Sequence, residues 1–99
     1  MLTKEQIKDT LVHNSTLLKE YKVSRIGLFG SMVNGHFSDT SDIDLLVDFS
    51  DTIDLFRYVH LTDTITSLLD RPVDLVTLNG IKPAIKDTIL SEVEWVEGL

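Results

Sequence analysis

The chain has 99 residues, 42% hydrophobic and 25% charged, a balance typical of one globular domain and not of a disordered chain. Its formal charge of −7 disfavours direct binding to nucleic acid, because an acidic surface repels the phosphate backbone. The absence of cysteine excludes disulfides and thiolate metal sites, and no apolar run predicts a signal peptide or a membrane-spanning helix. We therefore expect one cytoplasmic domain spanning residues 1–99.

The first half of the chain is expected to contain one helix and two strands. A capping box at Thr3 and Gln6 marks a helix start, and apolar residues recur behind it at helical spacing. Short β-prone runs then alternate with polar segments. In order, we predict a helix over residues 3–21, a strand over 24–29, a helical turn and loop over 31–41, and a strand over 42–49.

The second half of the chain predicts two helices around one strand. An amphipathic pattern indicates a helix over residues 54–69, ended by Pro72, and an apolar run indicates a strand over 73–78. Pro83 suits the first turn of a last helix, to residue 92, after which Trp95 and Val96 are expected to dock the tail. The element order favours a small α/β or α+β fold.

Asp42 and Asp44 form the first candidate site. Side chains two apart in a strand point to the same face, so both carboxylates can reach the same small group of cations. Mg²⁺ prefers oxygen ligands and commonly binds one or two carboxylates together with substrate phosphate. Taken alone, an Asp-x-Asp pair more often consists of solvated or capping carboxylates.

Two further features accompany this pair. Gly30-Ser31 ends a strand, where backbone N–H groups beside a hydroxyl can hold phosphate oxygens, although the same pair is common in turns and helix caps. Asp74 lies in the middle of a strand, where a carboxylate is costly unless it is paired, hydrated or metal-bound. It could face the same side as Asp42 and Asp44, or it could be an edge-strand residue bound to a lysine or arginine.

The combination is more specific than its parts. Gly30-Ser31 follows Leu28-Phe29, ten residues separate it from Asp42-Ile43-Asp44, and Asp74 lies in a later Val-Asp-Leu-Val run. This arrangement resembles the minimal nucleotidyltransferase family of the DNA polymerase β-like superfamily, from the first helix to the last. The resemblance implies a small mixed β-sheet with helices packed on one face, which binds ATP and two Mg²⁺ ions.

By this resemblance each candidate residue acquires a role. Gly30 and Ser31 would bind the β- and γ-phosphates, Asp42 and Asp44 would ligate the metals, and Asp74 would complete the metal site near the acceptor hydroxyl. Many family members are antitoxins that pair with a HEPN-type toxin, and some transfer AMP from ATP to a tyrosine of that toxin. The resemblance thus implies a hetero-oligomeric antitoxin enzyme. The alternative is an antitoxin that neutralises its toxin by binding alone.

The loop after Gly30-Ser31 departs from the family pattern. Close relatives carry arginine there, whereas this chain continues Met32-Val33-Asn34-Gly35 without a cation. Arginine is a strong phosphate ligand, and neither Met nor Asn replaces its charge. The residues that could compensate are Arg25, His36, Arg57 and Arg71. The three histidines show no metal-ligand spacing, and His36 is either a phosphate contact or, more simply, a loop residue.

Overall fold

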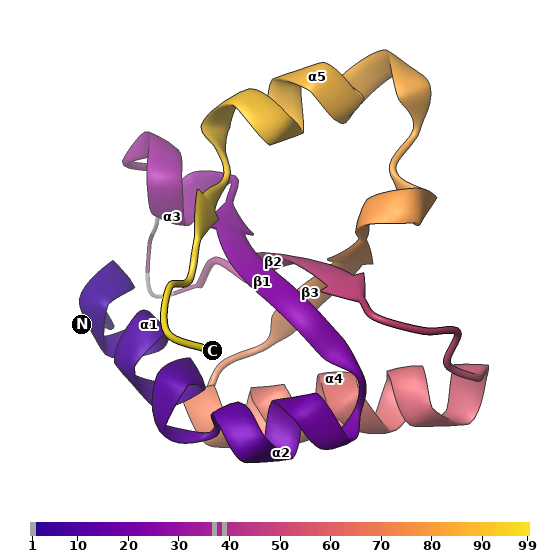
Figure 1. The fold of residues 1–99 in the computed structure, drawn as a ribbon. Helices are drawn as coiled ribbons and strands as arrows, with labels where there is room; N and C mark the ends of the chain where they lie inside the picture. Colours follow the sequence, from indigo (N-terminus) through magenta and orange to yellow (C-terminus); the bar gives the residue numbers. More distant parts are fainter. Residues whose placement is uncertain (1, 37, 39) are drawn as a thin grey trace.

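A four-stranded mixed sheet forms the centre of the fold in the computed structural model, which describes residues 2–36, 38 and 40–99 (Figure 1). The strand order is β3-β2-β1-β4. β1 (Val23–Phe29) pairs antiparallel with β2 (Ile43–Phe49) and with β4 (Glu94–Trp95), whereas β3 (Val73–Thr77) pairs parallel with β2. The expected small mixed sheet is confirmed.

The N-terminal helical segment is two helices, α1 (Lys4–His13) and α2 (Ser15–Glu20). The capping box of Thr3 and Gln6 is present, but the prediction of one continuous helix is wrong at Asn14, whose backbone leaves the helical region at φ −110° and ψ 24°. The Asn14 side-chain amide donates to the carbonyl of Thr10 at 2.8 Å. Asparagine competes with helical backbone hydrogen bonds in this way, which explains the break.

The remaining elements follow the expected order. The helical turn after Gly30 is α3 (Ser31–Asn34), and the loop predicted behind it includes residues 37 and 39, which lie outside the described residues. α4 (Leu55–Leu69) follows Asp54, whose side chain caps the helix by accepting from the Arg57 N–H. A short 3₁₀ turn, η1 (Leu78–Gly80), follows β3, so that strand ends one residue before its predicted limit. α5 (Pro83–Glu92) has its expected bounds.

The larger core lies between the sheet and α1, α2 and α4, which cover the same face (Figure 1). Alternate residues of β2 point into this core and are inaccessible to solvent: Ile43, Leu45 and Val47. They pack against fully buried side chains of the helices: Ile7 and Leu11 of α1 and Leu61 and Ile65 of α4. Burial of such aliphatic side chains, at about 1.5–3 kcal/mol each, is what holds the helices on the sheet.

The opposite face of the sheet carries a smaller core. Leu46 points to this face and is fully buried with Phe29, Ile81 and Ile89. α5 therefore lies across the sheet from the other long helices (Figure 1). The expectation of helices packed on one face describes α1, α2 and α4. α5 partly covers the opposite face, to which Leu46 and Asp44 of β2 point.

The C-terminal tail docks as expected, and it also adds a strand. Trp95 pairs with Gly27 of β1, and the Val96 N–H donates to the Ile26 carbonyl at 2.8 Å. A Cβ on Gly27 would lie 2.6 Å from the Val93 side chain, so this close approach requires glycine. No helix in the part of the chain that the structure describes is both long and apolar enough to cross a membrane.

Candidate active site

The strand pairing brings the candidate residues to one end of the sheet. Asp74 is the register partner of Asp44 in the parallel β2–β3 pair. Phe29 is the partner of Asp44 in the antiparallel β1–β2 pair, so Gly30-Ser31 follows directly beside it. Asp42 immediately precedes β2, two residues before Asp44, and is exposed. The end of β1 thus meets the beginnings of β2 and β3.

Gly30 is required by this geometry. Its backbone has φ 72° and ψ −143°, a conformation that L-residues with a side chain rarely adopt. A Cβ at this position would lie 2.2 Å from Oδ2 of Asp44. Any other residue would therefore displace the Asp44 carboxylate, which explains why glycine follows β1.

The Asp44 carboxyl lies in surroundings that disfavour its charged form. Burial raises its pKa, and the nearby charges of Asp74 and Asp42 raise it further, whereas a hydrogen bond from the Ser31 backbone N–H lowers it. The net effect is a pKa above the usual aspartate value. A bound cation would stabilise the charged form of the Asp44 carboxyl.

The carboxylates do not already form a metal cage. Within residues 2–36, 38 and 40–99, no three His, Cys, Asp or Glu side chains are gathered as ready-made metal ligands. Asp42 and Asp74 are nevertheless close enough to Asp44 for their charges to raise its pKa. Their carboxylate oxygens are the type of donor that Mg²⁺ prefers.

Glu92 is a residue of this site that the motif search missed. It lies in the last turn of α5, and its Oε1 accepts a hydrogen bond from the Gly30 backbone N–H at 3.2 Å. Its charge also raises the pKa of Asp44. The signal in the sequence was its position three residues after Ile89, which places it on the helix face that packs against the sheet.

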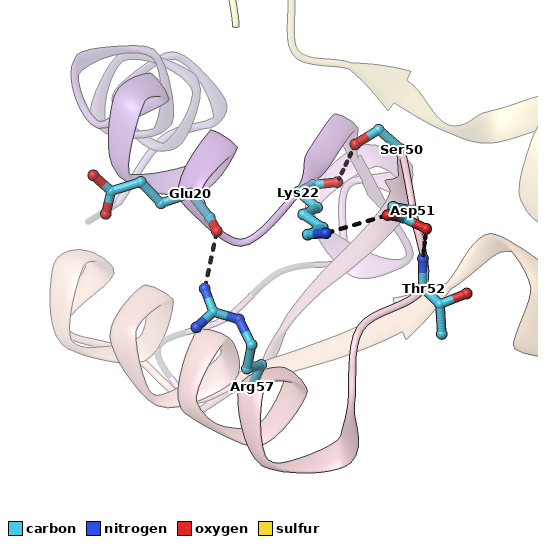
Figure 2. Close-up of polar contacts among 6 residues, drawn as sticks. All are labelled: Glu20, Lys22, Ser50, Asp51, Thr52 and Arg57. Atoms are coloured by element: carbon cyan, nitrogen blue, oxygen red, sulfur yellow. Dashed lines mark hydrogen bonds and ion pairs between the residues drawn. The ribbon is translucent and has the colours of Figure 1, made fainter.

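Two of the arginines considered as phosphate ligands are engaged away from the carboxylates. Arg25 pairs with Asp48 at 3.4 Å and stacks on the Trp95 ring, 4.1 Å from its centroid. Arg57, in the first turn of α4, donates to the backbone carbonyl of Glu20 at 2.9 Å (Figure 2). Neither arginine is placed to replace the missing loop cation.

Arg71 has a different position, in the segment that leads into β3. Its guanidinium donates to the carbonyls of Ser38 at 3.1 Å and Ser41 at 2.8 Å. These two residues belong to the loop that precedes Asp42, so Arg71 holds in place the segment that leads to the carboxylates. His36 is exposed, and its backbone N–H donates to the Asn34 side chain at 3.1 Å, as expected of a plain loop residue.

A cavity of about 680 Å³ lies at the opposite end of the sheet from the carboxylates. It is lined by the ends of β2 and β3, by the loop of residues 50–54, and by Leu55 and Tyr58 of α4. Lys22 holds this loop through an ion pair with Asp51 at 3.2 Å and a backbone carbonyl that accepts from Ser50 (Figure 2). None of the residues singled out from the motifs lines it.

Comparison with known proteins agrees with the geometry of the site. Residues 5–96 match the family described as polymerase beta, nucleotidyltransferase. The chain therefore belongs to the polymerase β nucleotidyltransferase family, as the resemblance of its motifs implied. Within that family it is similar to the protein adenylyltransferase MntA of Thermococcus cleftensis, with 39% identity over 97% of this chain and 98% of that protein.

Solved structures extend this similarity to the fold. One is a chain of a toxin–antitoxin complex crystallised with AMP-PNP, with a TM-score of 0.74 and 29% identity over 93% of this chain and 73% of that one. Another is from a complex of the tri-AMPylated HEPN toxin of Shewanella oneidensis with MNT antitoxin, with a TM-score of 0.67 and 26% identity over 94% and 73% of the two chains.

Proposed function

We propose that this chain is an antitoxin that transfers AMP from ATP to a tyrosine hydroxyl of a partner HEPN-type toxin. The observation that carries the proposal is the pairing of Asp44 with Asp74 directly beside Gly30. The similarity to MntA over 97% of the chain supports the protein substrate, and the AMPylated toxin in a related complex supports the transferred group.

Mg²⁺ fits the donor set of the site. Asp42, Asp44 and Asp74 would hold it, because they lie together at one end of the sheet and their carboxylates supply only hard oxygen ligands. When bound, two such ions would clamp the attacking and leaving oxygens of an in-line displacement at phosphorus. In the absence of a cation the three carboxylates would repel the triphosphate, so metal and ATP are expected to bind together.

The proposed transfer is a single displacement. The tyrosine oxygen of the acceptor forms a bond to the α-phosphorus of ATP, and the bond between that phosphorus and the bridging oxygen of the β-phosphate breaks. Pyrophosphate leaves with the bonding electrons, and the hydroxyl proton passes to a carboxylate. Asp74 is proposed as this base, because its side chain is exposed at the edge strand, where an acceptor can approach.

Gly30 and Ser31 are proposed to hold the β- and γ-phosphates. Gly30 permits a close backbone approach, and the Ser31 hydroxyl makes no hydrogen bond within the described part of the chain, which leaves it able to donate to a phosphate oxygen. The protein's contribution to the rate would then be positioning and fixed electrostatics.

A second function follows from the loop that lacks arginine. α3 (Ser31–Asn34) contains no cation, and Arg25 and Arg57 are engaged elsewhere. A chain with weak triphosphate affinity could neutralise a toxin by contact alone. The three carboxylates favour the enzyme, because a purely binding protein has no evident need for mutually repelling aspartates in a half-buried site.

Labelled ATP separates these functions. The wild-type chain with Mg²⁺ and the toxin encoded beside its gene should label the toxin, and the Asp42→Asn/Asp44→Asn variant should not. Equal labelling by the two proteins would refute the enzymatic function. If the variant still binds the toxin and still suppresses its toxicity in cells, then binding alone is the function. The exposed Asp63→Asn variant is the control for a change of charge.

A further inference from the structure

The backbone N–H groups of the Gly30-Ser31 turn are both engaged by carboxylates. The Gly30 N–H donates to Glu92 Oε1 at 3.2 Å, and the Ser31 N–H donates to Asp44. These amides come from the end of β1, while Glu92 is 62 residues away at the end of α5. An anion from the chain itself therefore lies where the proposed function requires phosphate oxygens.

Glu92 is not needed to hold α5 in place. The helix packs through Ile89, which is buried in the smaller core with Phe29 and Leu46. Its C-terminus is closed by the Val93 N–H, which donates to the Ile89 carbonyl at 2.9 Å, and β4 joins the sheet directly afterwards. Apolar packing and strand pairing thus position the last turn of α5 without a carboxylate.

The Glu92 charge is also unfavourable where it lies. The Asp44 carboxylate lies beside the same turn, since a Cβ on Gly30 would lie 2.2 Å from its Oδ2, and two neighbouring carboxylates repel each other. Described cations form their ion pairs elsewhere: Lys4 and Lys8 with Glu94, Lys22 with Asp51, and Arg25 with Asp48. A half-buried carboxylate that lies at the same turn as a second carboxylate and is not required for packing indicates a role in ligand binding.

We propose that Glu92 is a residue of the nucleotide site, whose carboxylate occupies the Gly30 amide in the free protein and is displaced by a phosphate group of ATP. It thereby lowers the affinity for the nucleotide and sets the concentration at which the site fills. This inference rests on the proposed function, since it assumes that Gly30 and Ser31 bind the triphosphate.

Titration calorimetry with AMP-PNP and Mg²⁺ tests the inference on three variants. Glu92→Gln removes the charge but keeps an acceptor for the Gly30 N–H, and we expect its dissociation constant to be about fivefold lower than that of the wild type. Glu92→Ala also vacates the amide, so its dissociation constant should be lower still. Asp87→Asn removes the same charge from an exposed position of α5 and should remain within about twofold of the wild type.

The competing explanation predicts the opposite sign. If Glu92 only holds the turn in shape, Glu92→Ala should bind AMP-PNP more weakly than the wild type, and Glu92→Gln should bind it equally well. Weaker or unchanged binding by Glu92→Ala overturns the inference, provided that thermal melting shows the variant to be folded. If Glu92→Ala does not fold, Glu92→Gln decides between the two explanations, because glutamine is close in size to glutamate: tighter binding of AMP-PNP supports the inference, and unchanged or weaker binding overturns it.

The outcome is separable from failure of the proposed function. If the wild type labels its toxin from ATP and the Glu92 variants bind AMP-PNP no more tightly, the inference alone is wrong. If neither the wild type nor the variants bind AMP-PNP with Mg²⁺, both the inference and the ATP-dependent activity are wrong. Tight binding by Glu92→Ala beside undetectable binding by the wild type supports the inference.

Discussion

Asp44 and Asp74 lie side by side on the neighbouring parallel strands β2 and β3, and the Asp74 charge raises the pKa of the half-buried Asp44 carboxyl. Burial is the larger cause of that shift, and Asp42 contributes after Asp74. The free protein therefore maintains a group of like charges at the end of its sheet. This cost to stability is characteristic of sites that bind a cationic ligand.

The raised pKa of Asp44 predicts the effect of pH on Asp44→Asn. The folded chain holds the Asp44 proton more tightly than the unfolded chain does, so stability falls as the pH rises from the ordinary carboxyl pKa through the raised one. Without divalent cations, Asp44→Asn should melt at a higher temperature than the wild type at neutral pH. The difference should vanish at about pH 3, where both states are protonated.

Thermal melting in EDTA across this pH range is the measurement. Asp63→Asn, on the exposed face of α4, is the control for removal of one charge from an acidic protein. If Asp63→Asn raises the melting temperature as much as Asp44→Asn does, then the overall charge of the protein, and not the group of carboxylates around Asp44, is responsible for the increase.

Gly30→Ala should cost stability and activity together. Its Cβ would lie 2.2 Å from Asp44 Oδ2, and its φ of 72° with ψ of −143° is strained for alanine. We expect a loss of more than about 2 kcal/mol in the free energy of unfolding, measured with urea. Gly35→Ala is a matched control, because Gly35 also has a positive φ, of 85°, but its Cβ would meet nothing within 4 Å.

Gly35→Ala should lose about 1 kcal/mol in the free energy of unfolding, because only the backbone strain acts there, and it should keep its transfer activity. The difference between the two glycine variants isolates the collision with Asp44. Equal losses for both would mean that the collision is relieved by movement of the side chain.

Arg71→Ala should reduce AMP transfer more than it reduces stability. The Arg71 guanidinium holds the carbonyls of Ser38 and Ser41, and its loss frees the loop that enters Asp42. We expect a fall of about tenfold in kcat/KM, since small displacements of a positioned ligand are costly in rate. Arg71→Lys keeps the charge without the planar guanidinium, whose Nη2 donates both hydrogen bonds, and should recover only part of the activity. Full activity of Arg71→Ala would exclude this bracing role.

Glu94→Gln should destabilise the attachment of β4. Glu94 accepts from Lys4 at 2.9 Å and from Lys8 at 3.1 Å, and these contacts lower its pKa. A lowered folded pKa means that the stabilisation is present above the ordinary glutamate pKa and is lost as the pH falls through the lowered value. About a third of the Glu94 side chain is exposed, so the effect should be small and should diminish at high salt.

Melting curves of the wild type and Glu94→Gln at low and high sodium chloride provide the measurement. A lower melting temperature for the variant at neutral pH and low salt is expected. The two proteins should converge at high salt, and a difference that persists there would assign the role to packing of the Glu94 stem.

The residues that the sequence identified are those whose signals are local. The alternation around Asp42 and Asp44 and the Gly30-Ser31 strand end each depend on a few neighbouring residues, and these motifs carry the resemblance to the family that the comparison confirms. The bounds of α5 followed in the same way from Pro83 and the apolar spacing behind it. The break at Asn14 was missed because a single side chain outweighed the helical periodicity around it.

Tertiary structure alone decided which of these residues meet. The parallel pairing of β3 with β2 makes Asp74 the neighbour of Asp44, and only the docking of α5 across that face brings Glu92 to Gly30, 62 residues away. β4 likewise forms because Trp95 pairs with Gly27 at the edge of β1. Local patterns determine which elements form, whereas strand order and long-range contacts depend on the packing of the whole chain.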